Sequence, residues 1–306
     1  MKKNKKILIV GGTGFIGYHL AKKCLDLNWS VVSVSTNYPR KIRNLKGVKY
    51  LKIDISKKKD LEKNLPYDFD YIVNLAGYVD HSNKKKTIKS HFNGCKNLAE
   101  FFLKKKIKKF IQIGSSIEYG KLKSPQIENK KNNQSTFSFY GKAKLLSTKY
   151  LINLSKKKNF PSTVIRLYLV YGPRQDINRV IPITIKNSLL NKKFDCSSGN
   201  QFRDFIFIDD VIRAILKTLK NKNTNGEIIN IGSSKPIKIK SLINKICLLV
   251  GTGKPIFGKV KMRKDEILHL YPNINKAKKI LNWQPKTNLN VGLKKTIKYY
   301  RNEKFS

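Results

Sequence analysis

The sequence of 306 residues is poor in the residue types that metal sites and disulfide frameworks need. Its four cysteines, at positions 24, 95, 196 and 247, form no Cys-x-x-Cys pair, and its four histidines show no zinc-type spacing. It has no apolar run of membrane-spanning length, and only four apolar residues separate the lysine-rich start from the first glycines. We therefore predict no metal, no membrane insertion and a location in the reducing cytoplasm.

Acidic residues are also scarce, with 19 Asp and Glu against 65 Lys and Arg, which gives a net charge of +46. Only nine of the basic residues are Arg, and the lysines are spread through every segment. A nucleic-acid-binding protein would more often gather Arg, Lys and aromatic residues on one face. We interpret the charge as a solvated surface that attracts small anions, and we expect no specific nucleic-acid partner.

What the first half does contain is an alternation of short apolar runs with helical patterns. The helical patterns cover residues 15–27, 89–103 and 140–154. This alternation predicts an α/β fold, a doubly wound parallel sheet of the Rossmann type. The predicted strands, each rich in Ile, Val or Leu, are residues 6–10, 31–35, 48–53, 71–76, 110–114 and 163–167.

The first predicted strand leads into a glycine-rich loop, Gly-Gly-Thr-Gly-Phe-Ile-Gly, and then into an amphipathic helix. Gly11 allows a tight turn there, Gly14 lets backbone N–H groups approach a pyrophosphate, and Gly17 lets the helix pack close to the strand. Strand, loop and helix in this order predict a dinucleotide-binding site.

The pattern becomes irregular after about residue 168, with a helix at 209–219 and a short strand at 228–231. We predict a dinucleotide-binding Rossmann domain over residues 1–168, with residues 205–233 packing back on it. Residues 169–204 and 234–306 are expected to form a smaller, interleaved C-terminal α/β lobe that binds the substrate.

The glycine spacing, with Asp54 after the third strand, resembles the extended short-chain dehydrogenase/reductase family, also called the NAD-dependent epimerase/dehydratase family. The resemblance continues in order through residues 74–77, 114–120, 140–144, 166–175, 203–211 and 282–285. It implies a nucleotide-diphosphate sugar as substrate and a homodimer. It also implies a cofactor site formed by Gly11, Thr13, Gly14, Phe15, Ile16, Gly17, Ser35, Thr36, Asn37, Arg40, Asp54, Ile55, Leu75, Ala76, Gly77, Tyr140 and Lys144.

The choice between NAD and NADP depends on the end of the second strand, where an NAD enzyme usually offers Asp or Glu to the adenosine ribose. Here that position holds Ser35, and Arg40 and Arg43 lie nearby in the sequence. The missing acid slightly favours NADP over NAD, because arginines can bind a 2′-phosphate.

A tyrosine with a lysine four residues later places both side chains on one helical face. Four such pairs occur, beginning at residues 18, 119, 140 and 300, so the spacing alone selects none of them. Only Tyr140 and Lys144 open a helix about 25 residues after a Ser-rich strand end, as the family does. We expect Tyr140 to be the acid/base, Lys144 to lower its pKa and hold the nicotinamide ribose, and Ser115 to contact the sugar oxygen, with Ser116 as the alternative.

Departures from the family pattern limit the assignment to a subfamily. Related dehydratases have an Asp-Glu pair where this chain has Ser116 and Ile117, so dehydration is disfavoured. His91 replaces a common Asn, and Leu169 replaces the Asn or Thr that precedes Val-Tyr-Gly-Pro. The resemblance therefore implies hydride transfer at sugar C4, by an epimerase or by a 4-keto-sugar reductase. The alternatives are a dehydratase-like member and a non-catalytic, nucleic-acid-binding or regulatory use of the fold.

Arginine is expected to bind the substrate diphosphate, because its guanidinium makes paired, charge-assisted hydrogen bonds to phosphate. Arg203 and Arg263 are the candidates, since both occupy positions that resemble those of the family. The alternative for Arg203 is an ion pair with a carboxylate such as Asp209, and Arg263 lies beside Asp265 and Glu266.

Overall fold

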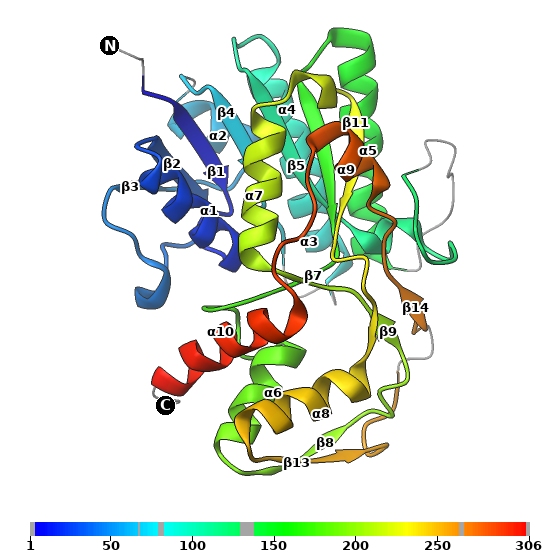
Figure 1. Cartoon of the computed structure of the whole chain (residues 1–306). Helices are drawn as coiled ribbons and strands as arrows, with labels where there is room; N and C mark the ends of the chain where they lie inside the picture. The colour runs from blue at the N-terminus through cyan, green and yellow to red at the C-terminus, as the bar shows by residue number, and fades with distance from the viewer. Residues whose placement is uncertain (1–3, 67, 79–82, 129–137, 263–265, 304–306) are drawn as a thin grey trace.

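The computed structural model describes residues 4–66, 68–78, 83–128, 138–262 and 266–303. Its centre is a parallel sheet in the order β11-β6-β5-β4-β1-β2-β3, with helices on both faces (Figure 1). The order reverses between β1 and β4, which places a ligand crevice at the carboxyl ends of these strands. The strands are β1 (Lys6–Val10), β2 (Ser30–Ser35), β3 (Val48–Lys52), β4 (Tyr71–Asn74), β5 (Lys109–Ser115), β6 (Ser162–Leu167) and β11 (Glu227–Ile231).

Successive side chains of each strand point to opposite faces, so the two faces of the sheet pack in two separate hydrophobic clusters. On β1, Ile7 and Ile9 pack in the cluster of α1 (Phe15–Asp26) and α7 (Ile208–Leu219). Leu8 and Val10 pack in the other cluster. The helical segments of that second face are α2 (Lys58–Asn64), α3 (Lys84–Ile88), the π-helical turn η2 (Lys89–Asn93), α4 (Gly94–Leu103) and α5 (Phe139–Lys158).

The predicted doubly wound sheet is confirmed, and all seven predicted strand segments lie in it. Two predicted strands, 48–53 and 71–76, extend past the observed strand ends at Lys52 and Asn74. Strand β4 stops at Asn74, because the Asn74 side chain accepts the backbone N–H of Ala76 at 3.1 Å and turns the chain. Helix α5 is longer than predicted: Ser138 caps its first turn, and Asn159, in the left-handed conformation at φ +53°, ends it.

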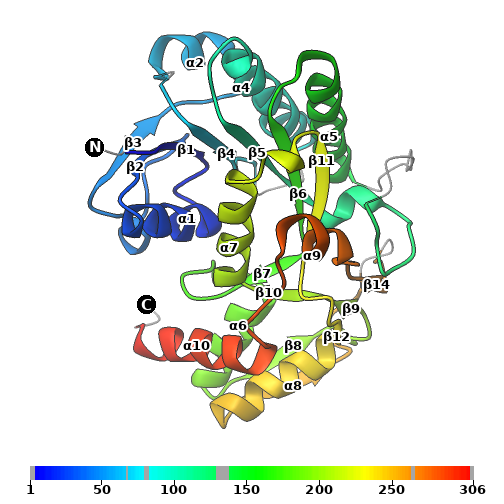
Figure 2. The ribbon, with the colours of Figure 1, turned by 45° about the horizontal axis from the view of Figure 1, so that its top comes forward.

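The chain leaves the sheet after β6, returns with α7 and β11, and leaves again (Figure 2). The part outside the sheet contains α6 (Val180–Leu189), α8 (Ile239–Val250) and α10 (Leu289–Asn302), while α9 (Asn275–Leu281) contacts β11. The predicted division into domains stays a prediction. The short strands are β7 (Leu169–Tyr171), β8 (Lys193–Cys196), β9 (Phe202–Arg203), β10 (Phe205–Phe207), β12 (Ile237–Lys238), β13 (Lys254–Phe257) and β14 (His269–Leu270).

The remaining short turns are η1 (Lys41–Arg43), η3 (Ser116–Tyr119) and η4 (Lys222–Thr224). Within the described ranges, no helix combines the length and the apolar character that crossing a membrane requires.

Candidate active site

A cavity of about 440 Å³ lies at the carboxyl edge of the sheet, between the glycine loop, the turn after β4, the end of β5 and the start of α5. Its other wall is formed by residues of the segment from Leu167 to Arg179. The cavity brings together twelve of the predicted site residues: Gly11, Gly14, Phe15, Ile16, Gly17, Leu75, Ala76, Gly77, Ser115, Ser116, Tyr140 and Lys144.

The glycine loop has the geometry that an anion site requires. Gly11 has φ +81°, and a Cβ there would lie 2.9 Å from the backbone N of Ala76. A Cβ on Gly17 would lie 2.5 Å from the carbonyl oxygen of Gly11, so the helix could not approach as closely. Gly14 is the N-cap of α1 and offers no side-chain cap, and no acid lies in the first turn. The first-turn N–H groups and the helix dipole therefore fit a pyrophosphate.

The remaining predicted cofactor residues do not line this cavity. The Ser35 hydroxyl accepts a hydrogen bond from Thr13 at 3.0 Å and donates one to the carbonyl of Val34 at 2.8 Å. Asp54 accepts hydrogen bonds from the backbone N–H and the hydroxyl of Ser56, at 3.0 and 2.6 Å. Ile55 is buried, whereas Thr36, Asn37 and Arg40 are exposed.

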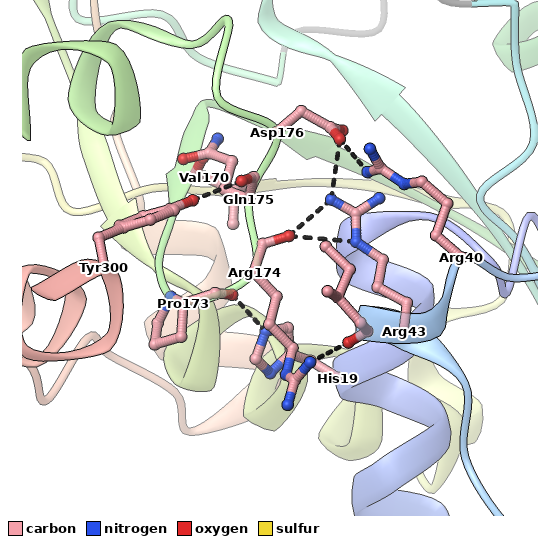
Figure 3. A network of polar contacts seen from close by, with 10 residues as sticks. His19, Arg40, Arg43, Val170, Pro173, Arg174, Gln175, Asp176 and Tyr300 are labelled. Carbon is pink, nitrogen blue, oxygen red and sulfur yellow. Dashed lines mark hydrogen bonds and ion pairs between the residues drawn. The ribbon is translucent and has the colours of Figure 1, made fainter. Parts of the chain in front are cut away.

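Figure 3 shows that the arginines after β2 already have partners. Arg43 is buried and donates two hydrogen bonds to the carbonyl of Arg174, at 3.1 and 2.6 Å. Its guanidinium lies 3.1 Å from the Asp176 carboxylate, which is also ion-paired with the exposed Arg40. A cofactor 2′-phosphate would therefore compete with Asp176 for both arginines.

The segment that contains Asp176 is held from three sides (Figure 3). His19 of α1 lies 2.9 Å from the carbonyl of Pro173, and the Tyr300 hydroxyl of α10 donates to the carbonyl of Gln175. Arg174, at φ +66°, extends its guanidinium to the carbonyl of Ile42. These contacts join the turn η1 after β2, the first helix and the last helix to one wall of the cavity.

The predicted catalytic residues lie together on the opposite wall. Ser115 ends β5, Tyr140 lies in the first turn of α5, and Lys144 follows one turn later. The buried Lys144 ammonium donates to the carbonyl of Ile113 at 2.7 Å and lies 5.9 Å from the centre of the Tyr140 ring. Burial lowers the pKa of Lys144 to about 8. This arrangement can hold a sugar oxygen between a hydroxyl and a phenol.

The electrostatics of Tyr140 differ from the expectation that Lys144 lowers its pKa. Desolvation raises the pKa of the phenol, and the charge of Glu118 adds to that effect. A hydrogen bond with Ser115 and the charge of Arg179 act in the opposite direction without cancelling it. The Lys144 ammonium, whose pKa burial lowers to about 8, donates to a backbone carbonyl instead. In this state the Tyr140 phenol gives up its proton less readily than a free tyrosine does.

The other Tyr/Lys pairs lie elsewhere. Tyr119 is buried, and its hydroxyl donates to Asn230 at 2.7 Å. Tyr18 and Lys22 line a different cavity of about 780 Å³ between α1 and α7, which contains none of the predicted catalytic residues. Lys304 lies outside the described residues. Chain order had selected the pair that lines the cavity beside the glycine loop.

Two arginines, Arg203 and Arg263, were predicted to bind the substrate diphosphate, and the structure describes the first of them. Arg203 is 8% exposed, donates to the carbonyl of Phe202 at 2.7 Å and is ion-paired with Glu266. Its carboxylate partner is thus Glu266 and not Asp209. Arg263 lies outside the described residues. Arg203 would have to leave Glu266 to bind a diphosphate.

Sequence reasoning missed several residues of the cavity wall. His91 packs edge-on against the Tyr140 ring with 5.0 Å between ring centres, and its Nε2 lies 3.2 Å from the carbonyl of Tyr78. Gln175, Asp176 and Arg179 also line the cavity. Two features of the sequence could have identified residues of this wall. His91 departs from the family pattern, and Arg179 is one of few arginines in a lysine-rich chain.

Comparison with known proteins places these features in a family. The family model described as NAD dependent epimerase/dehydratase family matches residues 7–232. The chain is 29% identical to CDP-abequose synthase from Salmonella muenchen, over 96% of this chain and 97% of that protein.

Two solved structures extend the likeness to the whole fold. UDP-glucose 4-epimerase from Thermotoga maritima, determined with UDP-glucose, is 25% identical with a TM-score of 0.88, over 97% of this chain and 98% of the other. UDP-glucuronic acid 4-epimerase from Bacillus cereus, in complex with UDP-glucuronic acid and NAD, is 27% identical with a TM-score of 0.85, over 96% and 98%. The chain therefore belongs to the NAD-dependent epimerase/dehydratase family, the extended short-chain dehydrogenases/reductases that modify nucleotide sugars.

Proposed function

We propose that the protein is an NAD(P)-dependent nucleotide-sugar enzyme that transfers hydride at sugar C4, as a 4-epimerase or a 4-keto-sugar reductase. The observation that carries the proposal is the gathering of Ser115, Tyr140 and Lys144 on one wall of the cavity beside the glycine loop. The Bacillus cereus relative, which is named a 4-epimerase and holds a UDP-sugar and NAD, supports the same substrate and cofactor classes here.

Each residue has a role that its contacts allow. Tyr140 takes or gives the proton at the oxygen on C4, and Ser115 donates a hydrogen bond to that oxygen. Lys144, held by the carbonyl of Ile113, keeps the start of α5 against the end of β5 and would contact the nicotinamide ribose. The first-turn N–H groups after Gly14 would hold the cofactor pyrophosphate. A bound nicotinamide dinucleotide supplies the hydride acceptor or donor.

Water elimination is disfavoured because Asp176, a carboxylate that lines the cavity, is already ion-paired with Arg40 and Arg43. Ser116 and Ile117 occupy the positions where related dehydratases have an Asp-Glu pair. The nearest carboxylate along the chain, Glu118, is buried and ion-paired with Arg166 at 3.0 Å. It is therefore not available to move protons to and from a sugar.

For the cofactor we favour NADP(H), since no acid stands at the end of β2 to repel a 2′-phosphate. Arg40 would exchange Asp176 for the phosphate. Calorimetric titration of both cofactors tests this. Ser35→Asp should shift the preference at least about tenfold toward NAD(H), and a tenfold preference of the unmodified protein for NAD(H) would contradict the proposal.

We also propose that the enzyme acts as a homodimer in the cytoplasm. The family resemblance supports the dimer, and light scattering on the purified protein at several concentrations measures it directly. A monomer at all concentrations would refute this part of the proposal.

The decisive experiment is a screen of nucleoside-diphosphate sugars and their 4-keto forms with NAD(H) and NADP(H). An epimerase changes the configuration at C4 without net change in the absorbance of the reduced nicotinamide. A reductase consumes the reduced nicotinamide with a 4-keto sugar. Loss of water would instead support the dehydratase alternative, and the absence of turnover with every pair would support a non-catalytic use of the fold.

A further inference from the structure

Glu118 is a buried carboxylate directly behind the end of β5, and its side chain has no exposed surface. One oxygen, Oε1, accepts the backbone N–H of Ser115 at 2.7 Å. The other, Oε2, accepts the Thr148 hydroxyl at 2.7 Å and lies 3.0 Å from both Nε and Nη2 of Arg166. The carboxylate is thus fully engaged on both oxygens.

The three partners come from three different elements of the fold. Ser115 ends β5, Arg166 lies on β6, and Thr148 lies on α5. Thr148 follows Tyr140 and Lys144 at successive intervals of four residues, so all three share one face of α5. Glu118 therefore joins the strand end that carries the serine to the helix face that carries the tyrosine.

The local backbone is arranged to allow this contact. Ser115 and Glu118 form a capping box around η3, in which the Ser115 hydroxyl accepts the N–H of Ile117 at 3.4 Å. Because that bond uses the hydroxyl as acceptor, its proton can still be donated. Gly114 provides the space, since a Cβ there would lie 2.5 Å from Oε1 of Glu118.

A buried ion pair is a costly way to stabilise a fold, because both charges lose their hydration. Apolar residues of similar size often stabilise a fold equally well. Arg166 is 4% exposed and has the Tyr119 ring on its other side, with 4.4 Å between the guanidinium carbon and the ring centre. The pair fixes geometry at the point where β5, β6 and α5 meet.

We propose that Glu118 is a positioning residue of the proton-transfer site, which holds Ser115 at a fixed place relative to Tyr140 and Lys144. This inference rests on the proposed function, because it assigns Glu118 a part in presenting the residues of that reaction.

The charge of Glu118 also acts on the groups it positions. It raises the pKa of Tyr140 and opposes the lowering of the pKa of Lys144. The other groups that face Tyr140 are Ser115 from β5, Lys144 from its own helix, His91 from η2 and Arg179 ahead of α6. Removing the charge of Glu118 should therefore lower the pKa of the Tyr140 phenol.

The test compares Glu118→Gln with Glu128→Gln. Glu128 is a matched control: it is also a buried carboxylate, and it accepts the N–H of Asn230 at 2.7 Å. With the nucleotide sugar found in the screen, Glu118→Gln should lower kcat about 10- to 100-fold while KM and cofactor Kd change less than about threefold. Glu128→Gln should leave kcat within about threefold. Equal effects of the two substitutions would overturn the inference.

A second readout needs no substrate. Tyrosine labelled with carbon-13 at Cζ, assigned with Tyr140→Phe, reports the titration of the phenol by NMR. The pKa of Tyr140 should be lower in Glu118→Gln and unchanged in Glu128→Gln, and an unchanged value in both would contradict the inference. If the unmodified protein turns over no nucleotide sugar, the proposed function fails. This titration still measures whether the charge of Glu118 changes the pKa of Tyr140.

The double variant Glu118→Gln, Arg166→Met covers the case in which the single variant does not fold, because it leaves no buried charge without a partner. Cofactor binding at the normal affinity shows that it is folded. It should show the same loss of kcat, and unchanged kcat in this variant would overturn the inference.

Discussion

Two buried lysines lie at opposite ends of strand β5, and their surroundings differ. Lys109 is the first residue of the strand and donates to the hydroxyl of Thr224 at 2.9 Å and to the side chain of Asn225. Lys144 reaches the other end from α5 and donates to the carbonyl of Ile113. Burial lowers the pKa of each to about 8.

The comparison shows that a buried amine with a lowered pKa does not by itself identify a site. Such perturbed groups occur in active sites, but structural networks produce them too. Only Lys144 lines the cavity at the carboxyl edge, while Lys109 is enclosed at the amino edge. The topology of the sheet, rather than the pKa, separates the two.

The largest effect is expected at the carboxyl end. Tyr140→Phe keeps the ring but removes the transferable proton, so kcat should fall about 10²- to 10⁴-fold with nearly unchanged cofactor affinity. Steady-state kinetics and calorimetry measure both. Tyr119→Phe is the control, because the Tyr119 hydroxyl is bonded to Asn230 away from the cavity. Turnover that survives in Tyr140→Phe would exclude this residue as the acid/base.

The two lysines can be compared directly by the same substitution. Lys144→Met should lower kcat about 100-fold and weaken cofactor binding, because it removes the group beside Tyr140. Lys109→Met should leave kcat and cofactor Kd within about twofold. Comparable losses of kcat and cofactor affinity in both variants would contradict the assignment of different roles to the two lysines.

A third prediction compares the buried charge of Arg203 with an exposed charge on the general surface. On the hypothesis that Arg203 leaves Glu266 to bind the substrate diphosphate, Arg203→Lys keeps the charge but loses the paired geometry. The substrate KM should then rise about 10- to 100-fold, as expected for a charge-assisted hydrogen bond of roughly 1.5 to 3 kcal/mol. Lys58→Ala removes an exposed charge and should change KM very little at physiological salt, where charges are screened beyond about 8 Å. Equal changes of KM in the two variants would mean that the substrate responds to the overall charge of the protein and not to Arg203 in particular.

The smallest effect is a pH dependence of stability at the amino end. Between pH 8 and 10.5 the folded protein releases the Lys109 proton while the unfolded chain keeps it, so the free energy of unfolding rises with pH in this range. Denaturant titrations should show that the unmodified protein gains about 1 to 3 kcal/mol relative to Lys109→Met across it. The reverse slope would mean that Lys109 is stabilised as a cation.

The sheet and one wall of the cavity could be predicted because their signals are local. Apolar runs mark the strands, and the order of Ser115, Tyr140 and Lys144 along the chain fixes their place at the carboxyl edge. The other wall could not be predicted, because it depends on pairs between distant segments. Asp176 meets Arg40, and Glu266 meets Arg203, and no spacing in a lysine-rich sequence indicates which charges will pair.

The pairing of β11 with β6 has a consequence for biosynthesis. Strand β6 ends at Leu167, but its partner β11 begins only at Glu227, after the ribosome has produced the segment 168–226. Until then the nascent sheet presents β6, which is buried throughout in the finished protein, as an open edge. A fragment that stops near residue 168 should therefore aggregate, and chaperones that shield strand edges should associate with the chain during this interval of its synthesis.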